Sequence, residues 1–181
     1  MMCALTLLFY EKMKPKNILL TGPPRCGKTT LVEKLIYQID KPCRGFFTRE
    51  IKEKGRRVGF SIITLDGQEA ILAHESLKSS IRVGKYGVDL NQFERIAIPA
   101  IWPSAAENIL IIDEIGKMEC YSPLFRDVLL KIFDAPNQLI ATIAWKGTPF
   151  IEKIKRRDDI TLLEITIENR DALVGSLLGM I

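Results

Sequence analysis

The feature that most constrains this chain is an octapeptide at residues 22–29, Gly-Pro-Pro-Arg-Cys-Gly-Lys-Thr. It has the spacing Gly-x-x-x-x-Gly-Lys-Thr. A short apolar run at residues 17–20 precedes it, and apolar residues recur at helical spacing over residues 28–39. The order strand, glycine loop and helix is the setting in which this spacing forms a phosphate-binding loop.

In such a loop, backbone N–H groups and the positive end of the helix surround the phosphates. Gly22 and Gly27 allow the close approach and the left-handed angles that other residues resist. We predict that Lys28 reaches the β and γ phosphates as a catalytic residue, and that the Thr29 hydroxyl binds Mg²⁺. For Arg25, inside the loop, an arginine-finger role and a solvent-facing position both remain open.

A second constraint is the run Ile-Leu-Ile-Ile-Asp-Glu at residues 109–114. Four consecutive apolar residues are typical of a parallel strand that is covered on both faces. Carboxylates at the carboxyl end of such a strand lie where ligands bind in open α/β sheets. We predict that Asp113 holds Mg²⁺ and that Glu114 orients or deprotonates the attacking water. For Lys117, a contact with the transferring phosphate and a surface turn are both open.

The rest of the chain predicts an α/β fold in a single domain of residues 1–181, with residues 1–12 as an N-terminal extension whose role is open. Strands at residues 45–51, 58–65 and 68–73 are separated by Lys-Gly and Asp-Gly, so an antiparallel meander should follow the first helix. Further helices are expected at residues 91–101, 123–133, 149–156 and 168–180, and buried strands at 109–112, 139–144 and 160–165. These elements predict a three-layer fold, in which helices cover both faces of a mainly parallel sheet.

Composition and charge exclude several classes of protein. Apolar residues make up 47% of the chain and charged residues 27%, which rules out a disordered or fibrous protein. The net charge of +4 is spread along the chain, so nucleic acid is a possible partner that the charge does not specifically indicate. A local basic hairpin comprises Lys52, Lys54, Arg56 and Arg57. It could bind RNA or an acidic partner, or it could be a solvated turn.

The apolar run at residues 4–10 is much shorter than the ~20 residues that cross a bilayer, and lysines follow it rather than precede it. Neither a membrane span nor secretion is expected. The four cysteines form no Cys-x-x-Cys pair, so a reduced, cytoplasmic protein is predicted. Cys26, at a helix N-terminus, is expected to react readily with alkylating reagents.

The chain resembles the small P-loop nucleoside-triphosphatase family known from thermophilic microbes and, in animals, as cancer-related nucleoside-triphosphatase. The matching blocks are residues 22–30, 45–48, 83–88, 113–119, 125–126 and 168–171. The resemblance spans nearly everything from Asn17 onward, and the block Asp-Glu-Ile-Gly-Lys-Met-Glu at 113–119 is its most specific part. The chain departs from the family in its first twelve residues, in a short stretch between Ile101 and Asn108, and at Arg49, where an acidic residue is often found.

The resemblance implies a RecA-like α/β fold and Mg²⁺-dependent hydrolysis of ATP, GTP, CTP and UTP with little base preference. It also implies a nucleotide site made by the phosphate loop and the acid-bearing strand. The residues so assigned are Gly22, Pro23, Pro24, Arg25, Cys26, Gly27, Lys28, Thr29, Thr30, Ile109, Leu110, Ile111, Ile112, Asp113, Glu114, Ile115 and Gly116. Independently, the chain contains no Asn-Lys-x-Asp, the motif with which GTPases read guanine.

Two other functions remain open at this point. The first is a small P-loop kinase that transfers the γ-phosphate to a small acceptor. Such kinases carry an arginine-rich lid, and only Arg156 and Arg157 stand in a suitable late position. The second is a nucleotide-driven switch or RNA-associated module, for which the basic hairpin is the only support.

Overall fold

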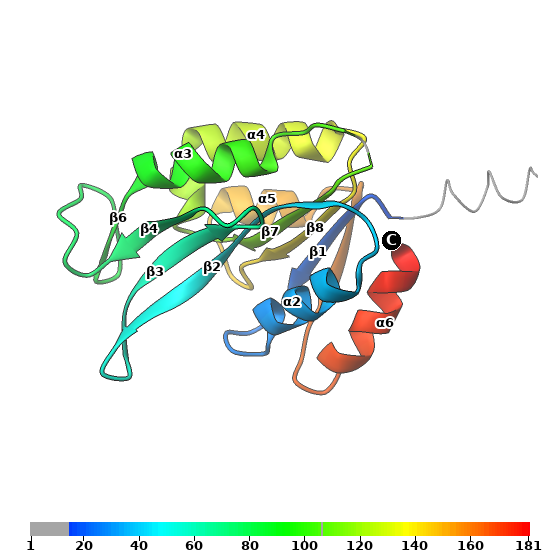
Figure 1. The fold of residues 1–181 in the computed structure, drawn as a ribbon, viewed down its shortest axis with the longest axis horizontal. Coiled ribbons are helices and arrows are strands. Elements are labelled where there is room, and N and C mark those ends of the chain that lie inside the picture. Colours follow the sequence, from blue (N-terminus) through cyan, green and yellow to red (C-terminus); the bar gives the residue numbers. More distant parts are fainter. Residues whose placement is uncertain (1–14, 106) are drawn as a thin grey trace, which may run out of the picture.

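The computed structural model describes residues 15–105 and 107–181. Its centre is a nine-stranded sheet of order β5-β6-β4-β3-β2-β7-β8-β1-β9 (Figure 1). The strands are β1 (Asn17–Thr21), β2 (Cys43–Glu53), β3 (Arg56–Thr64), β4 (Glu69–His74), β5 (Arg82–Val83), β6 (Tyr86–Val88), β7 (Ile109–Ile115), β8 (Leu139–Ile143) and β9 (Ile160–Glu164). The helices are α2 (Lys28–Gln38), α3 (Leu90–Ile101), the 3-10 helix η1 (Glu119–Tyr121), α4 (Pro123–Asp134), α5 (Pro149–Lys155) and α6 (Arg170–Met180).

The sheet has a parallel part and an antiparallel part that share one long strand. The strands β2, β7, β8, β1 and β9 pair in parallel. On its other edge β2 pairs with β3, and β4, β6 and β5 continue the antiparallel part. The predicted α/β sheet with a meander after the first helix is therefore confirmed. The meander reaches further than predicted, because β5 and β6, where the sequence predicts no strands, form a further antiparallel hairpin.

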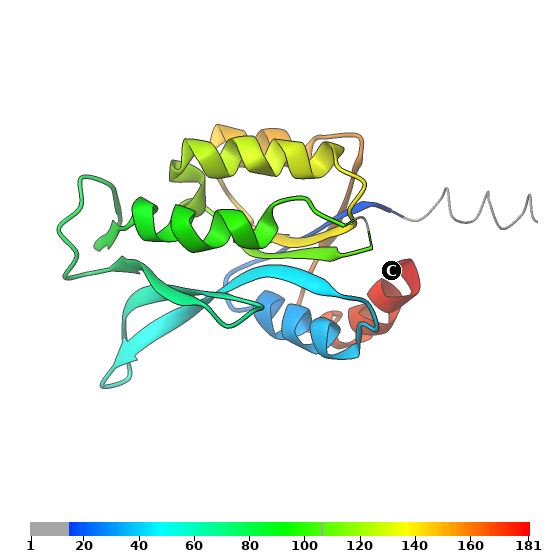
Figure 2. The same cartoon turned by 45° about the horizontal axis from the view of Figure 1, so that its top comes forward.

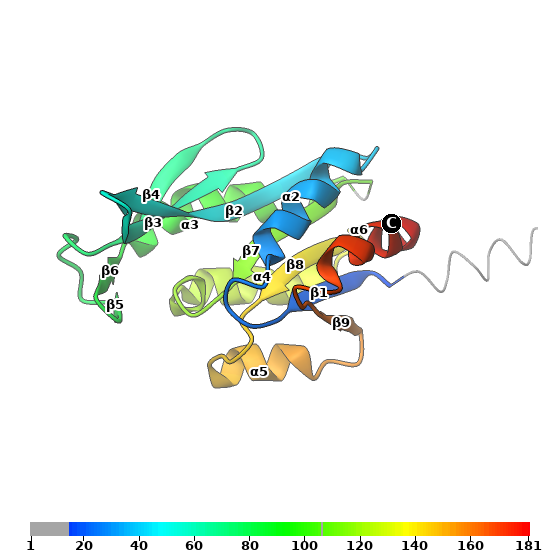
Figure 3. The same cartoon turned by 90° about the horizontal axis from the view of Figure 1, so that it is seen from below.

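Helices cover both faces of the sheet, so the predicted three-layer arrangement is confirmed. Figure 2 shows α3 and α4 on one face and α2 and α6 on the other, and Figure 3 shows α2 and α6 side by side. A hydrophobic core lies on each face of the sheet. The core under α3 and α4 includes an aromatic cluster, in which the ring centroid of Phe93 lies 5.9 Å from that of Phe46 and 5.3 Å from that of Phe125. The second core packs Leu31 and Leu35 of α2 against the other face.

Capping residues in the sequence determine where two of the helices begin. The Ser122 hydroxyl accepts a hydrogen bond from the Phe125 N–H at 2.9 Å, and Pro123 occupies the first turn of α4. Asp89 caps α3 in the same way, through the Gln92 N–H at 3.0 Å. Both caps satisfy backbone donors that have no partner within the helix.

One expectation about the strands is wrong, and one about the N-terminus lies outside the described residues. The strand β9 was expected to be buried, but it is the edge strand next to β1, and Leu162 is 40% exposed. An edge strand has a neighbour on one side only. The N-terminal extension, residues 1–12, lies outside the described residues. Within the described ranges, no helix combines the length and the apolar character needed to cross a membrane.

Candidate functional site

The two sequence motifs meet at the carboxyl edge of the parallel strands. The strand β1 leads into the glycine loop, and β7 carries Asp113 and Glu114 at its carboxyl end. One strand, β8, lies between β1 and β7 in the sheet. Loop and carboxylates come from separate strands, and the strand order of the sheet brings them together.

The glycine loop has the backbone geometry of an anion cradle. Gly27 has φ 98°, a left-handed angle that favours glycine, and it precedes the first turn of α2. No side chain among the described residues caps that turn, so its N–H groups are free to bind an anion. The Lys28 ammonium lies over the loop and donates to the Gly22 carbonyl at 3.1 Å.

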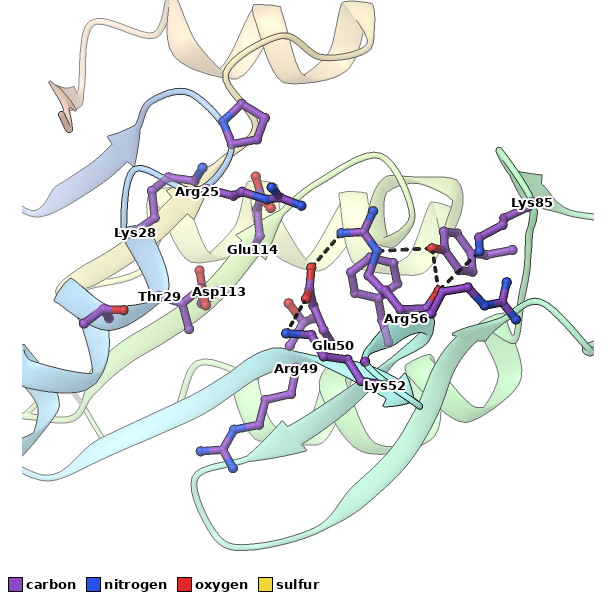
Figure 4. A pocket seen from close by; sticks show the side chains of 18 of the residues that line it. Arg25, Lys28, Thr29, Arg49, Glu50, Lys52, Arg56, Lys85, Asp113 and Glu114 are labelled. Carbon is purple, nitrogen blue, oxygen red and sulfur yellow. Dashed lines mark hydrogen bonds and ion pairs between the residues drawn. The ribbon is translucent and has the colours of Figure 1, made fainter. Parts of the chain in front are cut away.

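Asp113 is a buried carboxylate with one unsatisfied oxygen. It is 2% exposed, and the Thr142 hydroxyl donates to its Oδ1. Its Oδ2 has no hydrogen-bond partner among the described residues, and Thr29 lies beside it (Figure 4). Burial raises the pKa of Asp113, whereas the hydrogen bond from Thr142, the neighbouring Thr29 hydroxyl and the positive charge of Lys28 lower it.

This arrangement fits a divalent cation. A carboxylate oxygen and a hydroxyl are the hard oxygen ligands that Mg²⁺ binds, and a cation would satisfy the buried Oδ2 of Asp113. No group of three or more His, Cys, Asp or Glu side chains in the described part of the chain is placed to hold a metal. A cation at Asp113 and Thr29 therefore needs further oxygen ligands, which phosphate groups and water supply.

Glu114 is half-buried and lines the cleft described below, with Lys28 and Thr29 to one side of it (Figure 4). Burial raises its pKa and the negative charge of Asp113 raises it further, whereas the positive charge of Lys28 lowers it. A carboxylate with a raised pKa is a better proton acceptor near neutral pH than an exposed one.

Three residues near the site were given no role by the sequence. Glu119 is 5% exposed, and burial raises its pKa to about 8, with the charges of Glu114 and Asp113 acting in the same direction. Thr142 orients Asp113, and its only sequence signal is that it is the one polar residue in the strand β8. Arg170 lies so close to Gly27 that a Cβ there would stand 2.7 Å from its Nη1.

A cleft of about 1570 Å³ runs from the glycine loop to the β2–β3 hairpin. Its lining residues are Pro24, Arg25, Gly27, Lys28, Thr29, Thr30, Thr48, Arg49, Glu50, Lys52, Gly55, Arg56, Arg57, Phe60, Lys85, Tyr86, Asp113, Glu114 and Arg170. Eight of the assigned nucleotide-site residues are among them. The other nine do not line the cleft: Gly22, Pro23, Cys26, Ile109, Leu110, Ile111, Ile112, Ile115 and Gly116. Ile109 begins β7 at the end away from Asp113 and lines a separate pocket with Pro42 and Gln138.

The structure shows where the other candidate residues lie. Cys26 is 2% exposed, so the expectation of a readily accessible thiol is wrong. Arg25 is exposed and lines the cleft, whereas Lys117 is exposed outside its lining, as expected for a surface turn. Neither Arg156 nor Arg157 lines the cleft, and Arg157 pairs with acidic residues elsewhere.

The basic hairpin contributes directly to the cleft. Lys52, Arg56 and Arg57 line it, so three of the four hairpin cations face the same space as the glycine loop. All four side chains are exposed, as expected for a solvated turn, and this turn forms one wall of the cleft.

Known proteins are similar to this chain over most of its length. The sequence profile of the family described as NTPase matches residues 17–178. Nucleoside-triphosphatase THEP1 of Thermotoga sp. (strain RQ2) is 46% identical over 166 residues, covering 91% of this chain and 95% of that protein. Cancer-related nucleoside-triphosphatase of Homo sapiens is 37% identical over 176 residues, covering 88% and 93%.

A solved structure agrees with the sequence comparisons. The crystal structure of THEP1 from the hyperthermophile Aquifex aeolicus superposes with a TM-score of 0.83 at 38% identity, covering 91% of this chain and 98% of that one. Profile, sequence and structure thus match over nearly the full lengths of the proteins compared. The chain belongs to the NTPase family.

Proposed function

We propose that this protein hydrolyses nucleoside 5′-triphosphates of any base to the diphosphate and phosphate, with Mg²⁺ as cofactor. The observation that carries the proposal is a buried Asp113 oxygen that has no hydrogen-bond partner within residues 15–105 and 107–181. It lies beside Thr29 and in one cleft with Lys28 and Glu114. The two relatives compared above are named nucleoside-triphosphatases, which supports the same reaction class here.

Each residue of the site has a role that follows from its chemistry. The Lys28 ammonium and the N–H groups of the loop neutralise charge on the triphosphate. Thr29 and Asp113 would hold Mg²⁺, which when bound neutralises charge on the phosphate oxygens. Glu114 orients the attacking water and accepts its proton at a carboxylate oxygen, and the burial that raises its pKa favours this transfer.

Broad base specificity follows from what the site binds. The contacts assigned to Lys28, Thr29, Asp113 and the loop amides are all to phosphate groups or to the cation, which every nucleoside triphosphate shares. The kinase alternative has less support, because the two arginines expected in its lid do not line the cleft.

Phosphate release from ATP, GTP, CTP and UTP at matched concentrations tests the proposal. We expect similar rates for the four nucleotides, loss of release when EDTA removes the metal, and recovery when Mg²⁺ is restored. Release that persists in EDTA, or that is confined to one base, would contradict it.

A further inference from the structure

The cleft is larger than one nucleotide requires. Its volume of about 1570 Å³ exceeds the ~300–1,000 Å³ of typical small-molecule sites. The part away from the glycine loop is formed by the β2–β3 hairpin and the β5–β6 hairpin. We call this part the hairpin lobe, and it comprises Glu50, Lys52, Arg56, Arg57, Lys85 and Tyr86.

Positive charge is in excess in the hairpin lobe. Lys52 pairs with Glu50 at 3.2 Å, while Lys85 pairs with Glu75 at 2.9 Å. Arg56 shares Glu75, with its Nη1 donating at 3.0 Å. With Arg57, four cations therefore share two carboxylates, so the lobe favours an anionic ligand.

Arg57 of the hairpin lobe is held by two hydrogen bonds and by contacts with two aromatic rings. Its Nε donates to the Tyr86 hydroxyl at 3.1 Å and its Nη1 to Glu50 at 2.6 Å. Its guanidinium carbon lies 5.0 Å from the centroid of the Phe60 ring and 5.9 Å from that of Tyr86. Guanidinium has five N–H donors, and these two bonds leave others for a ligand. A cation held in this way binds a phosphate at a low cost in entropy.

The position of the hairpin lobe relative to Glu114 matters for its use. Figure 4 shows Lys28 and Thr29 on one side of Glu114, and Arg56 and Lys85 on the other. A triphosphate on the glycine loop would thus leave the lobe open on the far side of the catalytic carboxylate. A molecule in the lobe would lie beside a triphosphate on the loop, without needing to replace it.

We propose that the hairpin lobe binds a second ligand of the nucleoside monophosphate class while a nucleoside triphosphate occupies the glycine loop. The lysines and arginines would bind its phosphate. A planar base would stack on the Arg57 guanidinium, since the Arg57 side chain is 43% exposed. The inference rests on the proposed function for the site of the triphosphate.

The test is equilibrium dialysis of labelled AMP against the full chain, saturated with Mg²⁺ and an ATP analogue whose β,γ-bridge is methylene. We expect one AMP to bind per chain under these conditions, because the analogue occupies the loop and leaves the lobe free. Adenosine, which lacks the phosphate, and ribose 5-phosphate, which lacks the base, should each bind more weakly than AMP.

Two variants connect the bound AMP to the hairpin lobe. Arg57→Ala should weaken AMP binding by about tenfold or more, the effect of losing a charge-assisted hydrogen bond. Tyr86→Phe removes only the hydroxyl that holds Arg57, and should weaken it less. Arg95→Ala, on the exposed face of α3 outside the cleft lining, is the matched control and should bind AMP as the wild type does. If Arg57→Ala fails to fold, the loss of AMP affinity in Tyr86→Phe is the measurement that tests whether AMP binds in the hairpin lobe.

Three results would overturn the inference: displacement of AMP by the analogue, which would place AMP on the loop; no AMP binding at millimolar concentration; and binding of a short RNA but not of AMP. Phosphate release by the wild type, measured in parallel, separates this inference from the proposed function. Hydrolysis without AMP binding refutes the lobe alone, and AMP binding without hydrolysis refutes the proposed function alone.

Discussion

Asp113, Glu114 and Glu119 are carboxyl groups within seven residues of each other, and their surroundings give them different chemistry. Asp113 is buried between two threonine hydroxyls, and one of its oxygens fits a cation. Glu114 lines the cleft and lies within the field of Lys28. Glu119 is buried with the negative charges of both others acting on it, which is why its pKa rises to about 8. Residue type alone predicts none of these differences.

Glu119 should make stability depend on pH. Its pKa rises from 4.5 to about 8 on folding, so between these values the folded state keeps a proton that the unfolded state has lost. The free energy of unfolding should therefore fall as pH rises through this range, by up to about 1.4 kcal/mol per pH unit from this group.

Denaturant unfolding of the wild type and Glu119→Gln, at pH 5.5 and pH 8 in EDTA, measures that effect. The raised pKa values of Asp113 and Glu114 add slope of the same sign to both proteins, so the difference between them isolates Glu119. The variant should gain stability relative to the wild type at pH 8. A pH dependence identical in the two proteins would mean that Glu119 is ionised in the folded state.

At the scale of elements, the contact between β2 and β7 decides whether the two parts of the sheet can join. Gly45 of β2 has φ 133°, and a Cβ there would stand 1.8 Å from the Ile111 carbonyl oxygen of β7. Because that oxygen belongs to the backbone, it cannot rotate away. We expect Gly45→Ala to lose about 3 kcal/mol or more of unfolding free energy, measured by chemical denaturation.

Gly175→Ala is the control for that substitution. Gly175 lies in α6, and no atom of the described part of the chain would come within 4 Å of an added Cβ. Alanine should therefore change stability by less than about 1 kcal/mol, in the stabilising direction. Equal stability of the Gly45 and Gly175 variants would show that β2 and β7 have room to move apart.

Elements with a strong local signal could be predicted from the sequence. Apolar runs, the Lys-Gly and Asp-Gly turns, and Ser122 before Pro123 act within a few residues, and the strands and helices follow them. The edge position of β9 and the hairpin β5–β6 depend on which strands become neighbours. That order is set by packing of the whole sheet, which no local pattern encodes.

The candidate site divides in the same way. The roles proposed for Lys28, Thr29, Asp113 and Glu114 come from two short motifs, and the structure brings those residues into one cleft. The orientation of Asp113 by Thr142 could not be predicted, because it joins adjacent strands that are far apart in the sequence. The hairpin lobe could not be predicted either, since the position of the β2–β3 hairpin over the cleft depends on the whole antiparallel part.

For the molecule as a whole, the cleft lies where the parallel and antiparallel parts of the sheet meet. The parallel part supplies the glycine loop and the carboxylates, and the antiparallel part supplies the hairpin lobe. The strand β2 belongs to both parts, so it fixes their relative positions. The THEP1 proteins of Thermotoga sp. (strain RQ2) and Aquifex aeolicus match this chain over nearly their full lengths, so the match includes both parts of the sheet.

The most direct test of hydrolysis at this cleft compares nucleotide binding with turnover in Glu114→Gln. Glutamine keeps the shape of the side chain but cannot accept the proton of water. ATP affinity in the presence of Mg²⁺ should stay near the wild-type value, while phosphate release from the saturated protein should fall by about 10²–10⁴-fold. Lys28→Ala, by contrast, should weaken ATP binding itself. Near wild-type phosphate release by Glu114→Gln would contradict the account.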